Sequence, residues 1–188
     1  IFRIILVPIM VIIPFLGIPG DVWGIPVQNL IIIAIFAIAS YTDHLDGKIA
    51  RERNLVTTFG KFADPLADKI LVLSAMLMLV EMDYLPAWIP IIVLAREFVV
   101  SGYRLVAVEK GGKVIAASIW GKIKTCTQMI AIILAFLDLN NFGTFISGNL
   151  TGYSLVINVL SSSLMLISTI AAVFSGVDYL KGGKELLK

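Results

Sequence analysis

Four aspartates near the middle of the chain have the residue type and the spacing for metal-assisted chemistry at a phosphate group. Asp43 and Asp46 form one pair, Asp64 and Asp68 form a second, and each pair lies at the end of a long apolar run. Carboxylates at the edge of a bilayer are costly, so a chain that keeps four together is expected to use them. Small and basic residues lie between the pairs: Gly47, Lys48, Ala50, Arg51, Arg53, Gly60 and Lys61.

The mutual repulsion of these carboxylates indicates that they bind cations. At 100° per residue, Asp43 and Asp46 share one helix face, and Asp64 and Asp68 are one turn apart if a helix runs through them. Two like charges about 5 Å apart repel by roughly 3 kcal/mol at an effective dielectric of about 20. Oxygen ligands favour Mg²⁺ or Mn²⁺. Four carboxylates neutralise two divalent ions, which is the usual apparatus for displacement at phosphorus.

The residues between the two pairs suit a phosphate-bearing ligand. Gly47, Ala50 and Gly60 let a ligand approach the backbone closely, and Arg51 can pair with a phosphate. Under the competing interpretation, the aspartates only cap helices and pair with nearby lysines and arginines. Pro65 leaves two geometries open, because it can begin a helix that Asp64 caps or can kink a helix that runs through it.

The composition indicates an integral membrane protein. Hydrophobic residues make up 59% of the 188 residues, only 15% are charged, and the mean hydropathy is +0.96. Soluble domains run roughly 45–50% apolar and about 25% charged. We expect one membrane-embedded catalytic domain over residues 1–188, with lipid as its surroundings and no nucleic acid as a partner.

Six segments are long and apolar enough to predict transmembrane helices, so the expected fold class is all-α. Pro8 and Pro14 should kink the first segment. Turn residues after Leu16 should end it. The segments run from about Phe2 to Leu16, Val27 to Ala50, Thr57–Leu66 to Val80, Trp88 to Val108, Val114 to Leu137, and Tyr153 to Leu180.

The placement of charge predicts the topology. If six helices alternate in direction, all 15 lysines and arginines lie on the side of the termini. The opposite loops, Gly17–Pro26, Glu81–Ala87 and Asp138–Gly152, contain none. The positive-inside rule then places both termini and the aspartates on the cytoplasmic face of the cell membrane.

The aspartate stretch resembles the signature of the CDP-alcohol phosphotransferase family. The pattern is Asp43-x-x-Asp46-Gly47-x-x-Ala50-Arg51, eight residues, then Gly60-x-x-x-Asp64-x-x-x-Asp68, and every fixed position matches. The family has a six-helix membrane fold, which agrees with the helix count above.

That resemblance implies roles for the motif residues. Asp43, Asp46 and Asp64 would ligate two divalent ions that hold the diphosphate of CDP-diacylglycerol. Asp68 would complete the metal site and act as the base for the acceptor hydroxyl. The nucleotide pocket would be formed by Gly47, Ala50, Arg51 and Gly60.

A second set of charges suggests the acceptor. Charges within predicted spans usually face a polar cavity. Five of them could form a cationic pocket for an anionic acceptor: Arg3, Arg96, Arg104, Lys122 and Lys124. The runs Arg96-Glu97-Phe98 and Gly121-Lys122-x-Lys124-Thr125 resemble those of bacterial phosphatidylglycerophosphate synthases, whose acceptor is glycerol 3-phosphate. Glu97 is interpreted as an ion-pair partner of Arg96 or of a lysine. The competing interpretation of these cations is snorkelling to anionic headgroups.

Two alternative functions and one question of assembly remain open on sequence grounds. A sister enzyme would use inositol phosphate, serine or phosphatidylglycerol as its acceptor. A divalent-cation channel or carrier would use the aspartates as a filter, although a conducting pore should show polar residues toward both faces. A homodimer would also fit the family, with Ser161–Ser163 and Gly176 allowing close helix packing.

Overall fold

The protein is described here from a computed structural model, in which the backbone of residues 2–52, 58–109, 119–148 and 150–182 is defined. Side chains are defined for residues 5–42, 67, 69–104, 106, 119–148 and 150–181. This part of the chain confirms the predicted all-α class, because it folds into six α-helices. They are α1 (Phe2–Ile12), α2 (Val27–Glu52), α3 (Thr58–Glu81), α4 (Trp88–Glu109), α5 (Ile119–Leu137) and α6 (Gly152–Gly182). The predicted start of the fifth helix, Val114, lies outside the described residues.

The connection between α1 and α2 contains a small hairpin that the sequence pattern did not predict. After α1 the chain tightens into a 3-10 turn, η1 (Ile13–Leu16), which has Pro14 in its first turn and ends at Gly17 with φ 57°. Strands β1 (Asp21–Val22) and β2 (Ile25–Pro26) then pair antiparallel. Trp23 and Gly24 make the turn between them with φ of 55° and 80°. Two-residue turns with positive φ match the twist of a hairpin, and glycine adopts this geometry without strain.

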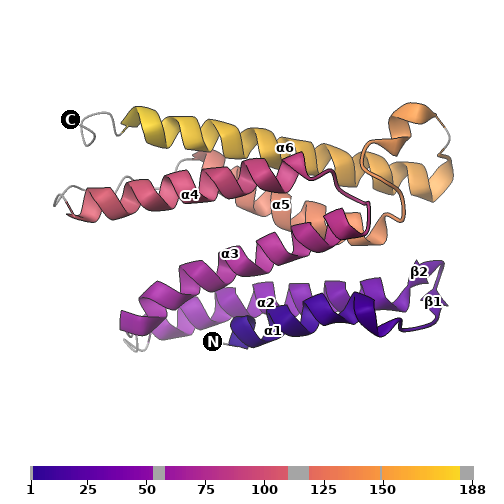
Figure 1. The fold of residues 1–188 in the computed structure, drawn as a ribbon, viewed down its shortest axis with the longest axis horizontal. Coiled ribbons are helices and arrows are strands. Elements are labelled where there is room, and N and C mark those ends of the chain that lie inside the picture. The colour runs from indigo at the N-terminus through magenta and orange to yellow at the C-terminus, as the bar shows by residue number, and fades with distance from the viewer. Residues whose placement is uncertain (1, 53–57, 110–118, 149, 183–188) are drawn as a thin grey trace.

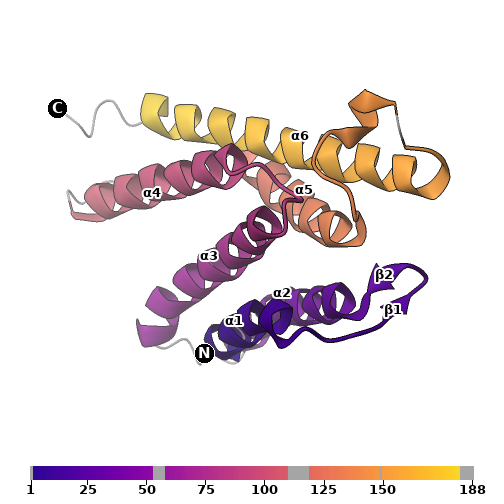
Figure 2. The same ribbon diagram turned by 45° about the vertical axis from the view of Figure 1, so that its right-hand side comes forward.

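The helices run back and forth between two ends of one bundle (Figure 1). The start of α1, the end of α2, the end of α4 and the end of α6 lie toward the same end of the molecule, on the left of that view. Helix α1 packs on α2 and α3, α5 packs on α6 and α2, and α4 packs on α6. Figure 2 shows α3 between the α1–α2 pair and the α4–α6 group.

Large apolar side chains from all six helices form the main core. Fully buried examples are Met10, Phe36, Leu71, Ile89, Phe136 and Met165. A second, smaller cluster joins α4 to α6 through Val100, Tyr103 and Tyr179. This second cluster lies beside the charged residues described below, so the packing of α6 and the placement of those charges are coupled.

A buried carboxylate fixes the loop at the opposite end of the bundle. Asp138, which is 3% exposed, accepts hydrogen bonds from Asn158 Nδ2 at 2.8 Å and from Ser161 Oγ at 2.7 Å. The Asn158 Oδ1 accepts the backbone N–H of Phe145, which lies in the 3-10 turn η2 (Thr144–Ser147). Because the buried polar groups satisfy one another, the α5–α6 connection is held against the first turns of α6.

Two of the described helices are long and apolar enough to cross a membrane. They are Ile119–Leu137, with a mean hydropathy of 1.3, and Gly152–Lys181, with a mean hydropathy of 2.0. The stretches Ile5–Leu16 and Val27–Thr42 are apolar but shorter. Helices α3 and α4 carry several charged residues each, and these charges interrupt their apolar runs. Helix composition therefore supports a membrane protein.

Candidate active site

The two helices that carry the aspartate motif meet at one end of the bundle. Positions 43, 46, 47 and 50 are on α2, and positions 60, 64 and 68 are on α3. Only residues 53–57 separate the end of α2 from the start of α3, so both ends lie at the same end of the bundle (Figure 1). The side chains of the four aspartates, with those of Arg3 and Arg51, lie outside the described residues. Among the described side chains, no group of three or more potential metal ligands occurs.

The structure decides between the two geometries that Pro65 left open. Helix α3 begins at Thr58 and includes Pro65, so the alternative in which Asp64 caps the helix is wrong. Proline inside a helix removes the hydrogen bond to the carbonyl four residues earlier, here that of Lys61. Asp64 and Asp68 are thus consecutive-turn positions of one helix, as the helical interpretation of the motif requires.

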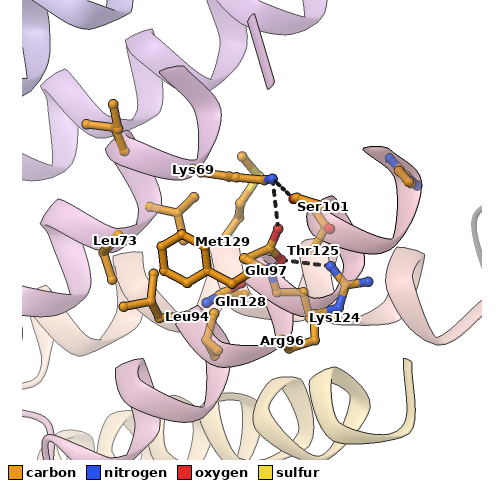
Figure 3. A pocket seen from close by; sticks show the side chains of 15 residues that line it. Lys69, Leu73, Leu94, Arg96, Glu97, Ser101, Lys124, Thr125, Gln128 and Met129 are labelled. Carbon is orange, nitrogen blue, oxygen red and sulfur yellow. Dashed lines mark hydrogen bonds and ion pairs between the residues drawn. The ribbon is translucent and has the colours of Figure 1, made fainter. Parts of the chain in front are cut away.

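A cavity of about 480 Å³ opens between α3, α4 and α5 beside the motif (Figure 3). Lys69, which directly follows the motif residue Asp68, lines it. Among the described side chains, four cations (Lys69, Arg96, Arg104 and Lys124) and one carboxylate (Glu97) line this cavity, so positive charge is in excess by three among them. Its other walls are largely apolar and include Leu73, Leu94, Phe98 and Met129. A ligand with an anionic group next to an apolar group would fit both the charged and the apolar walls of this cavity.

Glu97 organises the cations. Its Oε1 accepts hydrogen bonds from Arg96 Nη1 and from Lys124 Nζ, both at 2.8 Å. Lys69 Nζ lies 3.8 Å from the other carboxylate oxygen and also donates to Ser101 Oγ. The side chains of Glu97 and Lys124 are only 17% and 9% exposed. Low exposure strengthens such pairs relative to surface ion pairs, so Glu97 sets the positions of three cations.

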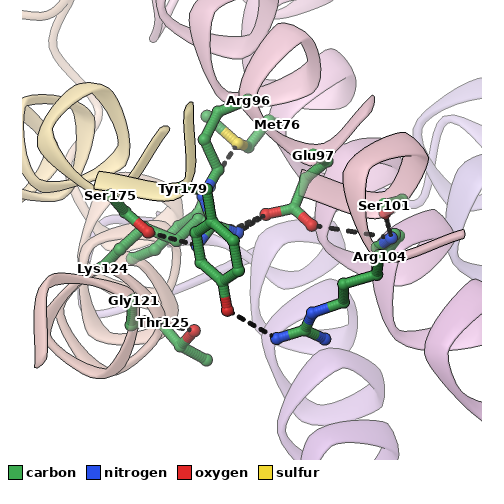
Figure 4. Close-up of polar contacts among 12 residues, drawn as sticks. Met76, Arg96, Glu97, Ser101, Arg104, Gly121, Lys124, Thr125, Ser175 and Tyr179 are labelled. Carbon is green, nitrogen blue, oxygen red and sulfur yellow. Dashed lines mark hydrogen bonds and ion pairs between the residues drawn. The ribbon is translucent and has the colours of Figure 1, made fainter. Parts of the chain in front are cut away.

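Helix α6 contacts the two arginines from the other side. Arg96 Nη2 donates to Ser175 Oγ at 2.5 Å, and Arg104 Nη2 donates to Tyr179 Oη at 2.8 Å. Figure 4 shows these contacts and the Glu97 contacts together. A second cavity, lined by Lys122, Gly121, Thr125 and Cys126, shares Arg96, Arg104 and Thr125 with the first.

The structure brings together most of the predicted cations. Arg96, Arg104 and Lys124 line one cavity, and Lys122 lines the cavity that shares its arginines. The prediction that Glu97 pairs with Arg96 or a lysine is confirmed. Sequence reasoning missed four contributors: Lys69, Ser101, Ser175 and Tyr179. Only Lys69 carried a signal, namely its place directly after Asp68.

Comparison with known proteins identifies the family. The family described as CDP-alcohol phosphatidyltransferase matches residues 1–174. The chain belongs to this family. A relative from Bacillus subtilis (strain 168), named CDP-diacylglycerol–glycerol-3-phosphate 3-phosphatidyltransferase, is 42% identical over 99% of this chain and 93% of its own length. A relative of the same name from Haemophilus influenzae is 35% identical over 100% of this chain and 91% of its own length. The protein named probable phosphatidylglycerophosphate synthase from Mycobacterium tuberculosis is 40% identical over 78% of this chain and 62% of its own length.

We expect the Glu97→Gln substitution to destabilise the protein strongly. The amide would leave Lys69, Arg96 and Lys124 close together without their shared negative charge. Removing one partner of a poorly exposed ion pair costs about 3 kcal/mol. The free energy of unfolding of the purified protein in detergent, measured by chemical denaturation, should fall by about that amount. Glu81→Gln is the matched control, since Glu81 is exposed at the end of α3. Equal stability of the two variants would contradict the role given to Glu97.

Proposed function

We propose that the protein transfers the phosphatidyl group of CDP-diacylglycerol to glycerol 3-phosphate and so produces phosphatidylglycerophosphate and CMP for phospholipid synthesis. Its membership of the CDP-alcohol phosphatidyltransferase family supports the reaction type. Two relatives that cover nearly the whole chain bear the name of this activity. The acceptor is the part of the proposal that most needs an independent argument.

The cationic cavity carries the argument for glycerol 3-phosphate. Its described side chains carry an excess of three positive charges, and one of them, Lys69, directly follows Asp68 in the chain. A phosphate monoester carries close to two negative charges at neutral pH. Arginine guanidinium groups pair well with phosphate oxygens. An uncharged alcohol would bring no negative charge to offset the positive charge that Glu97 leaves unbalanced among these side chains. We therefore assign Arg96, Arg104, Lys122 and Lys124 to the acceptor phosphate, with Arg3 as a further candidate.

The motif residues are proposed to bind the nucleotide and the divalent ions. Gly47, Ala50, Arg51 and Gly60 form the CDP pocket. The carboxylates proposed as metal ligands are Asp43, Asp46, Asp64 and Asp68. Their positions fit such ions, because α2 and α3 bring two carboxylate pairs to one end of the bundle and all the donor atoms are oxygens. Two Mg²⁺ or Mn²⁺ ions, when bound, would offset the negative charge of the diphosphate.

The reaction then follows from the residues on the two sides of the site. The cationic cavity orients glycerol 3-phosphate by its phosphate, and Asp68 takes the proton of the attacking hydroxyl group. A bond forms between the hydroxyl oxygen and the phosphorus that bears diacylglycerol. The bond from that phosphorus to the oxygen of CMP breaks, and CMP leaves with the electron pair. The ionised carboxylate of Asp68 is the form that can take this proton.

We further propose one membrane-embedded catalytic domain over residues 1–188 that crosses the cell membrane six times. Both termini and the site would face the cytoplasm. The distribution of lysine and arginine supports this orientation. The start of α1 and the end of α6 lie toward the same end of the bundle, which an even number of crossings requires (Figure 1).

An acceptor screen tests the proposed function. Purified protein is given CDP-diacylglycerol with glycerol 3-phosphate, glycerol, serine, inositol phosphate or phosphatidylglycerol in turn, and the lipid product is identified by mass spectrometry. We expect phosphatidylglycerophosphate and CMP in equal amounts with glycerol 3-phosphate. Glycerol is the matched control, since it differs only by the phosphate, and it should react at least about a hundredfold more slowly because it leaves the paired charges unused. Preference for glycerol or serine would contradict the assignment.

Two other outcomes would indicate the alternatives. Efficient reaction with inositol phosphate or phosphatidylglycerol would favour a sister enzyme with a different acceptor. Divalent-cation flux into liposomes that does not depend on CDP-diacylglycerol would favour a channel or carrier. A homodimer is a separate expectation, which the molecular mass of the protein–detergent complex tests.

A further inference from the structure

We propose that Ser175 and Tyr179 of α6 are positioning residues that hold the two acceptor arginines and thereby select a phosphate-bearing acceptor. The inference rests on the proposed function insofar as Arg96 and Arg104 bind the acceptor phosphate. It goes beyond that function because it gives a specific role to a helix that bears none of the proposed catalytic, metal or acceptor residues. Figure 4 shows Ser175 and Tyr179 directed at the arginines from one side.

The two residues lie on one face of α6. They are four positions apart, which is about one helical turn, so both project toward α4. Both are buried, with exposed fractions of 0% for Ser175 and 2% for Tyr179. The arginines that they contact are eight positions apart on α4, about two turns. The pairing of the two helix faces therefore fixes both guanidinium groups at once.

Ser175 holds Arg96 in a narrow space. The Oγ of Ser175 accepts a 2.5 Å hydrogen bond from Nη2 of Arg96, while Nη1 of the same guanidinium donates to Glu97. A Cβ atom added at Gly121 would lie 3.3 Å from that Nη2, and one added at Gly176 would lie 3.5 Å from Cγ of Arg96. Backbone on two sides and hydrogen bonds at the two terminal nitrogens, Nη1 and Nη2, leave the guanidinium little freedom to turn.

Tyr179 holds Arg104 without neutralising it. The phenol oxygen accepts a hydrogen bond from Nη2 at 2.8 Å, and the centre of the ring lies 5.5 Å from Cζ of the guanidinium. The ring itself is fixed by packing against Val100 and Tyr103. Both contacts favour the charged guanidinium, and neither supplies a negative charge. Tyr179 thus orients Arg104 and leaves its positive charge in place.

The cations of the site therefore have two kinds of partner, a carboxylate and neutral hydroxyl groups. Glu97 offsets part of the charge of Arg96, Lys69 and Lys124, whereas the α6 groups that contact Arg104 and Nη2 of Arg96 are neutral hydroxyl groups. A rigid arginine that is already oriented loses less entropy when it binds a phosphate. Replacing the hydroxyl groups should therefore weaken binding of the acceptor and leave binding of the nucleotide lipid unchanged.

The test compares Tyr179→Phe and Ser175→Ala with the native chain. CMP release is measured in detergent while either glycerol 3-phosphate or CDP-diacylglycerol is varied. A hydrogen bond to a charged group is worth enough to change affinity by about tenfold. We expect the KM for glycerol 3-phosphate to rise by about that factor in each variant, with the KM for CDP-diacylglycerol unchanged.

Two control variants remove the same groups where they have no such role. Tyr103→Phe removes a buried phenol hydroxyl from the same aromatic cluster, and within the described residues that hydroxyl has no hydrogen-bond partner. Ser168→Ala removes a buried α6 hydroxyl that bonds to the carbonyl of Met165. Both controls should keep the native KM values. A rise in the KM for glycerol 3-phosphate as large in the controls as in Tyr179→Phe and Ser175→Ala would overturn the proposal.

A double-mutant comparison separates positioning from general packing. In an Arg104→Ala background, the further change Tyr179→Phe should have almost no effect on the KM for glycerol 3-phosphate, because the group that it positions is gone. Additive effects would show that Tyr179 acts independently of Arg104 and would overturn the proposal for this pair.

A binding measurement keeps the outcome separate from that of the proposed function. If the native chain releases no CMP with glycerol 3-phosphate, the proposed function fails. Protection from thermal unfolding by inorganic phosphate is then compared between the native chain and Tyr179→Phe. An apparent Kd for phosphate about tenfold weaker in the variant would support the positioning role, and equal Kd values would overturn it.

Discussion

The Asp68→Asn variant is expected to fold normally and to release CMP from CDP-diacylglycerol and glycerol 3-phosphate at less than about one-hundredth of the native rate. An amide cannot accept the proton of the attacking hydroxyl group, and a positioned base typically contributes about 10²–10⁴-fold to the rate. The same change removes one negative charge from the proposed metal ligands. The initial rate of CMP release, measured at saturating concentrations of both substrates, checks the prediction.

Asp83→Asn is the matched control for this variant. Asp83 is exposed in the turn between α3 and α4, at the other end of α3 from the motif, with φ of 60°. Asparagine tolerates this left-handed conformation, so the control should keep both stability and activity. Native activity in Asp68→Asn would remove Asp68 from the role of base, and the neighbouring carboxylates would have to be considered instead.

Removal of divalent ions is expected to abolish CMP release, and either Mg²⁺ or Mn²⁺ should restore it. Without cations, each pair of ionised carboxylates about 5 Å apart would repel by roughly 3 kcal/mol. The site would then hold protons instead of ions and could not offset the charge of the diphosphate. The measurement is CMP release after treatment with EDTA and after addition of each metal in excess.

Binding of the metal can be measured without turnover. Titration with Mn²⁺, followed by the loss of its free electron paramagnetic resonance signal, should give two ions bound per chain. The Asp68→Asn variant should bind them more weakly, because it has lost one ligand charge. Full activity in the presence of EDTA, together with no bound Mn²⁺, would contradict the two-metal proposal and favour aspartates that serve only as ion-pair partners of nearby lysines and arginines.

The helices and part of the charged cavity could be predicted because their signals are local. Helix α2 begins at Val27 and α4 begins at Trp88, as predicted, since apolar runs and turn residues mark both places. Glu97 adjoins Arg96 in the sequence, and a charge pair within an apolar helix predicts a shared polar environment. These predictions depend on neighbours within one or two turns.

The contacts of α6 could not be predicted, because their partners are distant in the sequence. Ser175 is 79 residues from Arg96, and Tyr179 is 75 residues from Arg104. A serine and a tyrosine in a long apolar helix match the pattern of ordinary packing residues. The hairpin at Asp21–Pro26 was missed for another reason, since strands of two residues are too short to show an alternating pattern.

Charged residues also interrupt the apolar sequence of two of the helices. Helix α3 carries Lys61, Asp64, Asp68 and Lys69, and α4 carries Arg96, Glu97 and Arg104. Each set lowers the mean hydropathy of a helix that has an otherwise apolar sequence. In α5 and α6 the charges lie near one end, so each helix keeps a long apolar run.

The hydrogen bonds between the arginines of α4 and the hydroxyl groups of α6 also imply an order in which the parts of the site are completed during synthesis. Chains are synthesised from the N-terminus, so the motif helices and α4 are complete before residue 175 has been made. A nascent chain that stops before Ser175 contains every aspartate of the motif, and yet Arg96 and Arg104 lack the hydroxyl groups that orient them. The acceptor side of the site is therefore complete only when α6 has been synthesised and has packed on α4. An unfinished chain should bind the acceptor weakly and so should use little CDP-diacylglycerol.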